Sequence, residues 1–142
     1  MTSMAGDSVV VLGGSGFVGR HVVARLAAAD RRVVVPTRRR ESARHLILLP
    51  TVDVIEADAH DPAVLDRLLD GAGAVVNLVG ILDPVGRDSF ERVHVELARK
   101  VVAACDRAGV SRLIHMSALG AAVDAPSRYQ RSKAEGEALV TA

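Results

Sequence analysis

Short, continuously apolar segments alternate with segments of helical periodicity along the whole chain, and this alternation limits the possible folds more than any other feature. The apolar segments are rich in Val and Ile, which is typical of parallel strands covered on both faces. The predicted strands are 8–12, 32–36, 52–57, 74–79 and 112–117. The predicted helices are 17–29, 42–49, 62–69 and 89–108, with a last helix that starts near Tyr129.

Strands that alternate with helices form parallel sheets through right-handed crossovers. We therefore predict one α/β domain over residues 1–142, a Rossmann-like doubly wound parallel sheet of about five strands in the order 3-2-1-4-5. A sheet of this class usually has a sixth strand after the last helix. We expect the C-terminal part of the fold, which shapes a substrate pocket, to be missing from this sequence.

Composition excludes several classes of function. Eighteen Lys and Arg against seventeen Asp and Glu, interleaved along the chain, give a net charge of +1 and no sign of nucleic-acid binding. The single cysteine rules out an intrachain disulfide, and the histidines have no ligand spacing, so no metal site is predicted. No segment has the roughly 20 apolar residues of a membrane span, and no signal peptide is evident. We expect a cytoplasmic protein.

The first predicted strand runs directly into a glycine-rich turn, GGSGFVG at residues 13–19. Glycines at these spacings permit a tight turn, bring backbone N–H groups close to a pyrophosphate, and let the next helix pack tightly on the strand. The N–H groups and dipole at the start of that helix would also favour the pyrophosphate. Such a pattern alone is often only a turn, but its place between a strand and an amphipathic helix predicts dinucleotide binding.

The end of the second predicted strand indicates which dinucleotide binds. NAD-specific proteins carry an acidic residue there, whereas this chain has Thr37, Arg38 and Arg39 and no carboxylate before Glu41. Arginine can hold a 2′-phosphate through charge-assisted, often bidentate hydrogen bonds. The sequence therefore favours NADP(H) over NAD(H). The alternative is a solvated arginine run in a protein whose bases are mostly arginine.

Three residues have the chemistry of acid–base catalysis. Tyr129 and Lys133 lie four residues apart, on one face of the last predicted helix. Ser117 ends the fifth predicted strand, at the edge where parallel sheets bind ligands. A phenol ordinarily has a pKa of about 10, and a nearby ammonium lowers it. The trio predicts proton transfer to or from an alcohol or carbonyl, with the nicotinamide carrying the hydride.

These motifs, together with NLVG at 77–80, resemble the short-chain dehydrogenase/reductase superfamily, in its extended or atypical branch, and its NAD-dependent epimerase/dehydratase-like members. Segments 77–82, 93–96, 113–120 and 129–137 are similar, more narrowly, to the group related to the NADPH-binding accessory subunit of respiratory complex I. One departure is His94, which stands where many relatives have Asn and leaves a proton-relay role for that position in doubt.

The resemblance implies a role for each matching residue. Ser117, Tyr129 and Lys133 are the implied catalytic set, and Lys133 would also contact the nicotinamide ribose. Other residues would hold the pyrophosphate, the adenine and the riboses. With Ser15 of the turn and the residues that end the second strand, the expected cofactor set is Gly13, Ser15, Gly16, Phe17, Val18, Thr37, Arg38, Arg39, Asp58, Ala59, Val79, Gly80 and Lys133.

Two functions remain open. The first is an NADP(H)-dependent oxidoreductase or epimerase that acts on a carbonyl or alcohol, with the tyrosine as general acid or base. The alternative is a non-catalytic NADPH-binding accessory or assembly protein, peripheral to a respiratory assembly similar to complex I. A third interpretation is that these residues are a portion of a longer enzyme. Asp83 and Asp88, in a loop after the fourth strand, are candidates for substrate contact, although solvated loop carboxylates are commoner. Fold alone does not decide between these functions.

Overall fold

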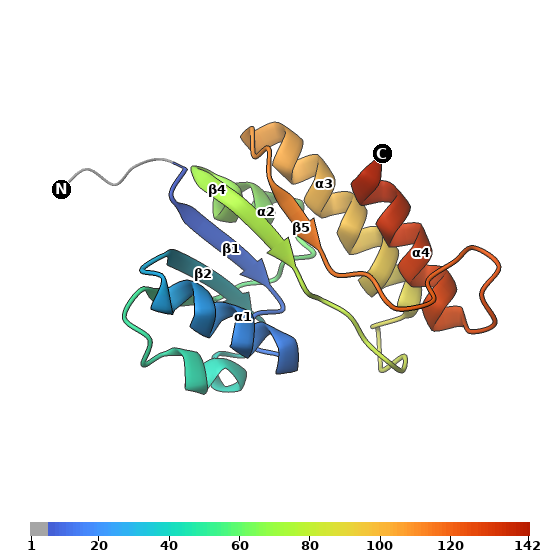
Figure 1. Ribbon diagram of the computed structural model, residues 1–142, viewed down its shortest axis with the longest axis horizontal. Helices are drawn as coiled ribbons and strands as arrows, with labels where there is room; N and C mark the ends of the chain where they lie inside the picture. Colours follow the sequence, from blue (N-terminus) through green and yellow to red (C-terminus); the bar gives the residue numbers. More distant parts are fainter. Residues whose placement is uncertain (1–5) are drawn as a thin grey trace.

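The predicted strands form one parallel sheet in the computed structural model, which describes residues 6–142 (Figure 1). The strand order 3-2-1-4-5 is confirmed. The fourth strand starts and ends two residues before its predicted bounds, and the fifth is shorter than predicted. The strands are β1 (Ser8–Leu12), β2 (Arg32–Thr37), β3 (Val52–Glu56), β4 (Ala72–Asn77) and β5 (Leu113–His115).

The helices α1 (Phe17–Ala28), α2 (Pro62–Leu69), α3 (Leu97–Ala108) and α4 (Arg128–Thr141) occupy predicted positions. Local capping explains two of their ends. The Asp61 carboxylate accepts a hydrogen bond from the Ala63 N–H at 3.0 Å and starts α2, and Gly109, with φ of 72°, ends α3 in the left-handed region. No helix within residues 6–142 is long and apolar enough to cross a bilayer.

Two predicted helices differ from α-helical geometry. Segment 42–49 was predicted as an α-helix, but η1 (Arg40–Leu46) is a 3₁₀ helix, with Ala43 outside helical φ/ψ. Its buried residues, Ala43 and Leu46, are three apart, which matches the 3₁₀ repeat. The predicted long helix 89–108 begins with a π-helical turn, η2 (Glu91–Glu96), in which Val93, His94 and Val95 are all buried. A wider turn of this kind is common at functional sites.

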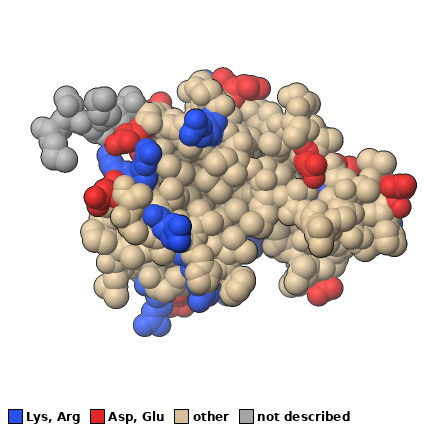
Figure 2. Space-filling model, in the orientation of Figure 1, with Lys and Arg blue, Asp and Glu red and all other residues tan. Residues whose placement is uncertain are grey.

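The side chains of each central strand point alternately to two separate apolar clusters. Val10 and Leu12 pack with α2 and α3, whereas Val11 packs on the other face with α1 and η1. In Figure 1, α1 lies in front of β1 and β2, and no helix lies in front of β5. Ile114, on this side of β5, is accordingly 55% exposed. Figure 2 shows a broad area almost without charged side chains in the middle of the same face.

Candidate functional site

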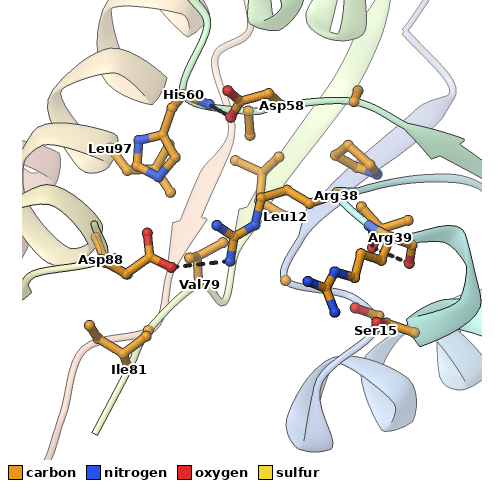
Figure 3. Close-up of a pocket in the computed structure, with 18 residues that line it drawn as sticks. Leu12, Ser15, Arg38, Arg39, Asp58, His60, Val79, Ile81, Asp88 and Leu97 are labelled. Carbon is orange, nitrogen blue, oxygen red and sulfur yellow. Dashed lines mark hydrogen bonds and ion pairs between the residues drawn. The ribbon is translucent and has the colours of Figure 1, made fainter. Parts of the chain in front are cut away.

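A pocket of about 700 Å³ opens at the carboxyl ends of the strands, beside the switch point between β1 and β4 in the strand order (Figure 3). In open parallel sheets this crevice is the usual place for a ligand. Its walls come from the turn after β1, the end of β2 and the loops after β3 and β4. It brings together these predicted cofactor residues: Gly13, Ser15, Thr37, Arg38, Arg39, Asp58, Ala59, Val79 and Gly80.

The glycine-rich turn closes the pocket at the start of α1. Gly13 has φ of +77°, and a Cβ there would lie 2.9 Å from the Leu78 carbonyl carbon, so both conformation and space require glycine. A Cβ on Gly19 would overlap the backbone of Gly13 and Gly14, which lets α1 pack against the turn. Gly16 differs, because a Cβ there would meet only the Gly13 oxygen, at 3.4 Å. Space inside the protein therefore does not explain glycine at position 16.

Gly16, Phe17 and Val18, the remaining predicted residues of this turn, lie at the start of α1 and do not line the pocket. The Phe17 and Val18 side chains are exposed. Gly16, which caps α1, offers no side chain to the first-turn N–H groups, and the first turn contains no acidic residue. The start of α1 thus keeps the backbone donors and positive dipole end that favour an anion.

The end of β2 is organised by a buried hydroxyl. Thr37 Oγ1 accepts a hydrogen bond from the Arg39 N–H at 3.3 Å and donates one to the Arg39 carbonyl oxygen at 3.0 Å. The Arg39 side chain lies on the side of Ser15 in Figure 3. Arg38 extends the other way and forms an ion pair with Asp88, at 3.2 Å. On the β3 side, the Asp58 carboxylate accepts the His60 N–H at 2.9 Å.

The predicted catalytic residues lie beyond Gly80, outside the pocket lining. Lys133 Nζ donates a hydrogen bond to the Met116 carbonyl oxygen at 2.7 Å, and its side chain is only 4% exposed. Burial lowers the pKa of Lys133. A Cβ placed on Gly80 would lie 3.8 Å from this Nζ, so Lys133 adjoins the pocket wall. Ser117 Oγ is buried and has no hydrogen-bond partner among residues 6–142.

Tyr129 lies in the first turn of α4, one helical turn before Lys133. Its ring packs edge-on against Phe90, with ring centres 6.1 Å apart, and against His94, at 5.4 Å. Ser127 caps the helix by accepting the Gln130 N–H at 3.1 Å. The structure therefore brings Lys133 to the pocket wall and the tyrosine ring to η2.

His94, which is 2% exposed, links η2 to two other parts of the site. Its Nε2 accepts the Ile81 N–H at 3.0 Å, and its Nδ1 lies 2.8 Å from Ser132 Oγ. That hydroxyl donates its proton to the Tyr129 carbonyl oxygen at 2.9 Å, so it must accept from His94. These directions fix His94 as a neutral imidazole with its proton on Nδ1. The ring thereby joins the loop after β4 to the start of α4.

Asn77 and His115 form a second buried link at the ends of β4 and β5. The Asn77 side-chain oxygen accepts the Val79 N–H at 3.2 Å, so its amide nitrogen donates to His115 Nδ1, also at 3.2 Å. This interaction supports the Val79 side of the pocket. Burial first, and the Lys133 charge second, lower the pKa of His115.

The sequence indicated neither histidine link. The sequence left a proton-relay role for His94 in doubt and assigned no role to His115. The apolar residues on either side of His94 do not predict its burial, because neighbouring residues of a helix point in different directions. Within the described residues 6–142, no group of three or more His, Cys, Asp or Glu side chains is placed to hold a metal ion.

Acid should destabilise the fold through His94. Burial, followed by the charges of Lys133 and His115, lowers the pKa of His94 to about 4 from 6.5. Below pH 6.5 the unfolded chain binds a proton that folded His94 excludes until pH falls to about 4. The unfolding free energy should therefore fall by about 2 to 3 kcal/mol between pH 7 and pH 4.5 from this residue.

Urea denaturation of the parent and of His94→Gln at several pH values measures this dependence. Glutamine does not titrate, so the variant should lose less stability on acidification, whatever its stability at pH 7. His60 and His115, whose pKa values burial also lowers, should leave a smaller dependence of the same sign. Parallel pH curves for the two proteins would contradict the prediction.

Comparison with known proteins identifies the family. The model of a family described as NAD(P)H-binding matches residues 13–141. The mitochondrial NADH-ubiquinone oxidoreductase 40 kDa subunit of Neurospora crassa is 33% identical over 142 residues, covering 98% of this chain and 38% of the subunit. The ceramide reductase of Caulobacter vibrioides is 34% identical over 142 residues, covering all of this chain and 44% of the reductase.

Among solved structures, MoeE5 in complex with UDP-glucuronic acid and NAD is similar, with a TM-score of 0.73 and 27% identity. The match covers 93% of this chain and 48% of that one. The chain thus spans less than half the length of each of these three proteins. The family match includes the glycine-rich turn, the pocket and α4. The chain therefore belongs to the NAD(P)H-binding family, and its resemblance to the extended short-chain dehydrogenase/reductase group is confirmed.

Proposed function

We propose that this domain belongs to an NADP(H)-dependent oxidoreductase or epimerase that acts on a carbonyl or alcohol. The observation that carries the proposal is the place of Lys133. Its buried ammonium adjoins Gly80 of the pocket wall and donates a hydrogen bond to the carbonyl oxygen of Met116, the residue before Ser117. A buried lysine with a lowered pKa beside a nucleotide-sized pocket is a feature of functional sites.

The residues present fit a dinucleotide. A Cβ on Gly16 would meet only the Gly13 oxygen, at 3.4 Å, and the uncapped start of α1 provides donors for a pyrophosphate. Asp58 and Ala59 would contact the adenine, and Val79 and Gly80 the riboses. When bound, the nicotinamide supplies or accepts the hydride.

The chain's own residues would position the substrate and move the proton. Ser117 Oγ, which lacks a partner among the described residues, would hydrogen-bond the substrate oxygen. The Tyr129 hydroxyl would give its proton to that oxygen during carbonyl reduction, or accept one during alcohol oxidation. Lys133 would hold the ribose and favour the charged form of a nearby phenol.

Arg38 and Arg39 support the choice of NADP(H). Both line the pocket where the second strand ends, and the Arg39 side chain makes no hydrogen bond or ion pair within residues 6–142. A charge-assisted contact with a 2′-phosphate should make NADPH bind more tightly than NADH by about 1.5–3 kcal/mol. Calorimetry measures both affinities, and Arg38→Asp combined with Arg39→Ser should remove the difference. Equal affinities in the parent protein would mean that the arginines are a solvated surface.

The alternative is an NADPH-binding accessory or assembly protein. The similarity to the 40 kDa subunit of NADH-ubiquinone oxidoreductase supports this function, and the similarity to ceramide reductase supports the enzyme. NADPH oxidation with a panel of aldehydes, ketones and quinones, using the longest natural form of the protein, separates the two. Tight NADPH binding without any turnover would favour the accessory protein, held peripherally on a respiratory assembly. The cytoplasmic location is part of the enzyme proposal, and cell fractionation tests it.

A further inference from the structure

One ion pair crosses the pocket from wall to wall. Arg38, at the end of β2, and Asp88, in the loop before η2, both line the pocket. Arg38 Nη2 lies 3.2 Å from Asp88 Oδ2, with a separation of 50 residues in the sequence. Figure 3 shows the Arg38 guanidinium between the Ser15 side and the Asp58 side of the pocket, directed at the carboxylate. A nucleotide that enters between these sides must meet this pair.

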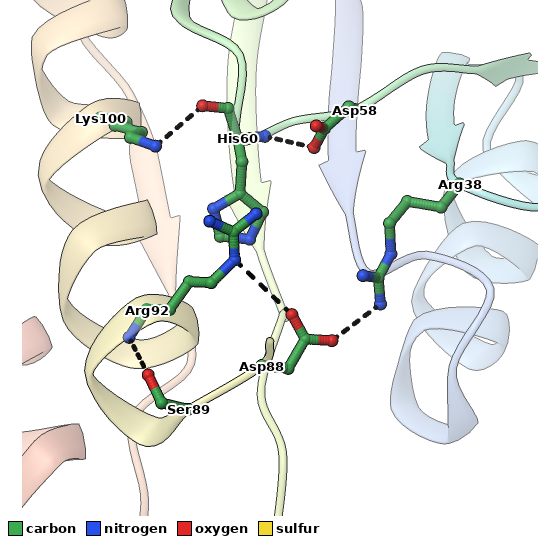
Figure 4. Close-up of polar contacts among 7 residues, drawn as sticks. All are labelled: Arg38, Asp58, His60, Asp88, Ser89, Arg92 and Lys100. Atoms are coloured by element: carbon green, nitrogen blue, oxygen red, sulfur yellow. Dashed lines mark hydrogen bonds and ion pairs between the residues drawn. The ribbon is translucent and has the colours of Figure 1, made fainter. Parts of the chain in front are cut away.

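The Asp88 carboxylate is held in place by its surroundings. Asp88 and Val85 exchange two backbone hydrogen bonds, of 2.9 and 3.0 Å, across a tight turn. The second carboxylate oxygen lies 3.7 Å from Arg92 Nε, as Figure 4 shows. The Asp88 side chain is 18% exposed, whereas that of Arg38 is 67% exposed. Arg38 is therefore the partner that can turn away without loss of packing.

The charge of Asp88 is unfavourable for the proposed ligand. A 2′-phosphate brings about two negative charges and needs arginine donors. Arg38 already has a carboxylate partner in Asp88, so the phosphate must compete for it. NADH has a 2′-hydroxyl in place of the 2′-phosphate, so a contact with Arg38 adds little to its affinity when the ion pair opens.

We propose that Asp88 is a specificity-determining residue that restrains NADPH binding by competing with the 2′-phosphate for Arg38. This inference rests on the proposed NADP(H) binding. It gives Asp88 a role different from the substrate contact suggested by its loop position. When NADPH binds, the 2′-phosphate replaces the Asp88 carboxylate as the partner of Arg38.

Asp88→Asn tests the inference because it removes the charge and keeps the shape of the side chain. NADPH should bind about three- to fivefold more tightly to the variant, the range expected for a partly exposed ion pair, and NADH less than twofold more tightly. Asp66→Asn is the matched control. Asp66 pairs with Arg107 at 2.9 Å on α2 and α3, and neither residue lines this pocket. The control should change neither affinity.

A double variant shows whether the effect acts through Arg38. In an Arg38→Gln background, Asp88→Asn should no longer improve NADPH binding, because the competition is gone. Fluorescence titration and calorimetry on the folded variants provide the dissociation constants. Unchanged NADPH affinity in Asp88→Asn, an equal gain for NADH, or a gain that survives Arg38→Gln would each overturn the inference. A parent protein that binds no NADPH would instead overturn the proposed function.

Discussion

Tyr129→Phe should leave NADPH affinity nearly unchanged and lower turnover by about 10²–10⁴-fold, the usual effect of losing a positioned general acid. The variant keeps the ring that packs against Phe90 and His94. It also keeps the backbone carbonyl that accepts the Ser132 hydroxyl. The phenol oxygen has no hydrogen bond within residues 6–142 that would hold α4 in place. The substitution therefore removes the proposed general acid and little else.

Lys133→Met provides the contrast. Its ammonium lies beside Gly80 and is proposed to contact the ribose, so this variant should lose NADPH affinity as well as turnover. NADPH fluorescence measures binding, and the carbonyl panel measures turnover, with circular dichroism to check folding. Parent turnover that survives Tyr129→Phe undiminished would remove the tyrosine from the mechanism. A parent protein that binds NADPH without turnover would favour the accessory function.

Much of the fold follows from patterns local to single elements. The continuous Val-rich strands and the helical segments between them determine the parallel sheet, and the crossover rules determine its strand order. The shapes of η1 and η2 depend on how they pack, η1 against β2 and β3 and η2 against α3 and α4. Periodicity cannot distinguish a 3₁₀ from an α-helix when apolar residues stand at both three- and four-residue spacings, as Leu46 and Ile47 do from Ala43. The π turn, in turn, contains three consecutive buried residues.

The candidate site likewise contains residues that the sequence predicted and side-chain contacts that it did not. The predicted residues that line the pocket follow the ends of strands, where the topology brings them together. The spacing of the glycines and the end of the second strand predicted part of this set, and the family resemblance supplied Asp58, Ala59, Val79 and Gly80. The pairing of Arg38 with Asp88 joins residues 50 positions apart, through side-chain directions that no local pattern contains. The same is true of the link from His94 to Ile81 and Ser132. Whether the predicted residues bind a cofactor and catalyse a reaction stays a prediction for experiment.

Gly16→Val should abolish NADPH binding, with a loss of affinity of at least about 100-fold, while the protein stays folded. Gly16 has φ of −77° in an extended conformation that any residue adopts, and it is exposed. A Cβ there meets only one backbone oxygen, at 3.4 Å, so the fold has room for it. The valine side chain would, however, take the space of the proposed pyrophosphate, which must approach the backbone of this turn closely.

Gly19→Ala, in the same turn, should behave in the opposite manner and thus controls for general damage. Its Cβ would overlap the backbone of Gly13 and Gly14, so the variant should lose stability in urea denaturation even without ligand. For Gly16→Val we expect an unchanged helical circular-dichroism signal and an unfolding free energy within about 1 kcal/mol of the parent, as for other surface substitutions. NADPH fluorescence titration then measures the binding. Gly19 lies three residues from Gly16, so it is a local control. Retained NADPH binding in folded Gly16→Val would place the nucleotide away from the turn and contradict the proposed site.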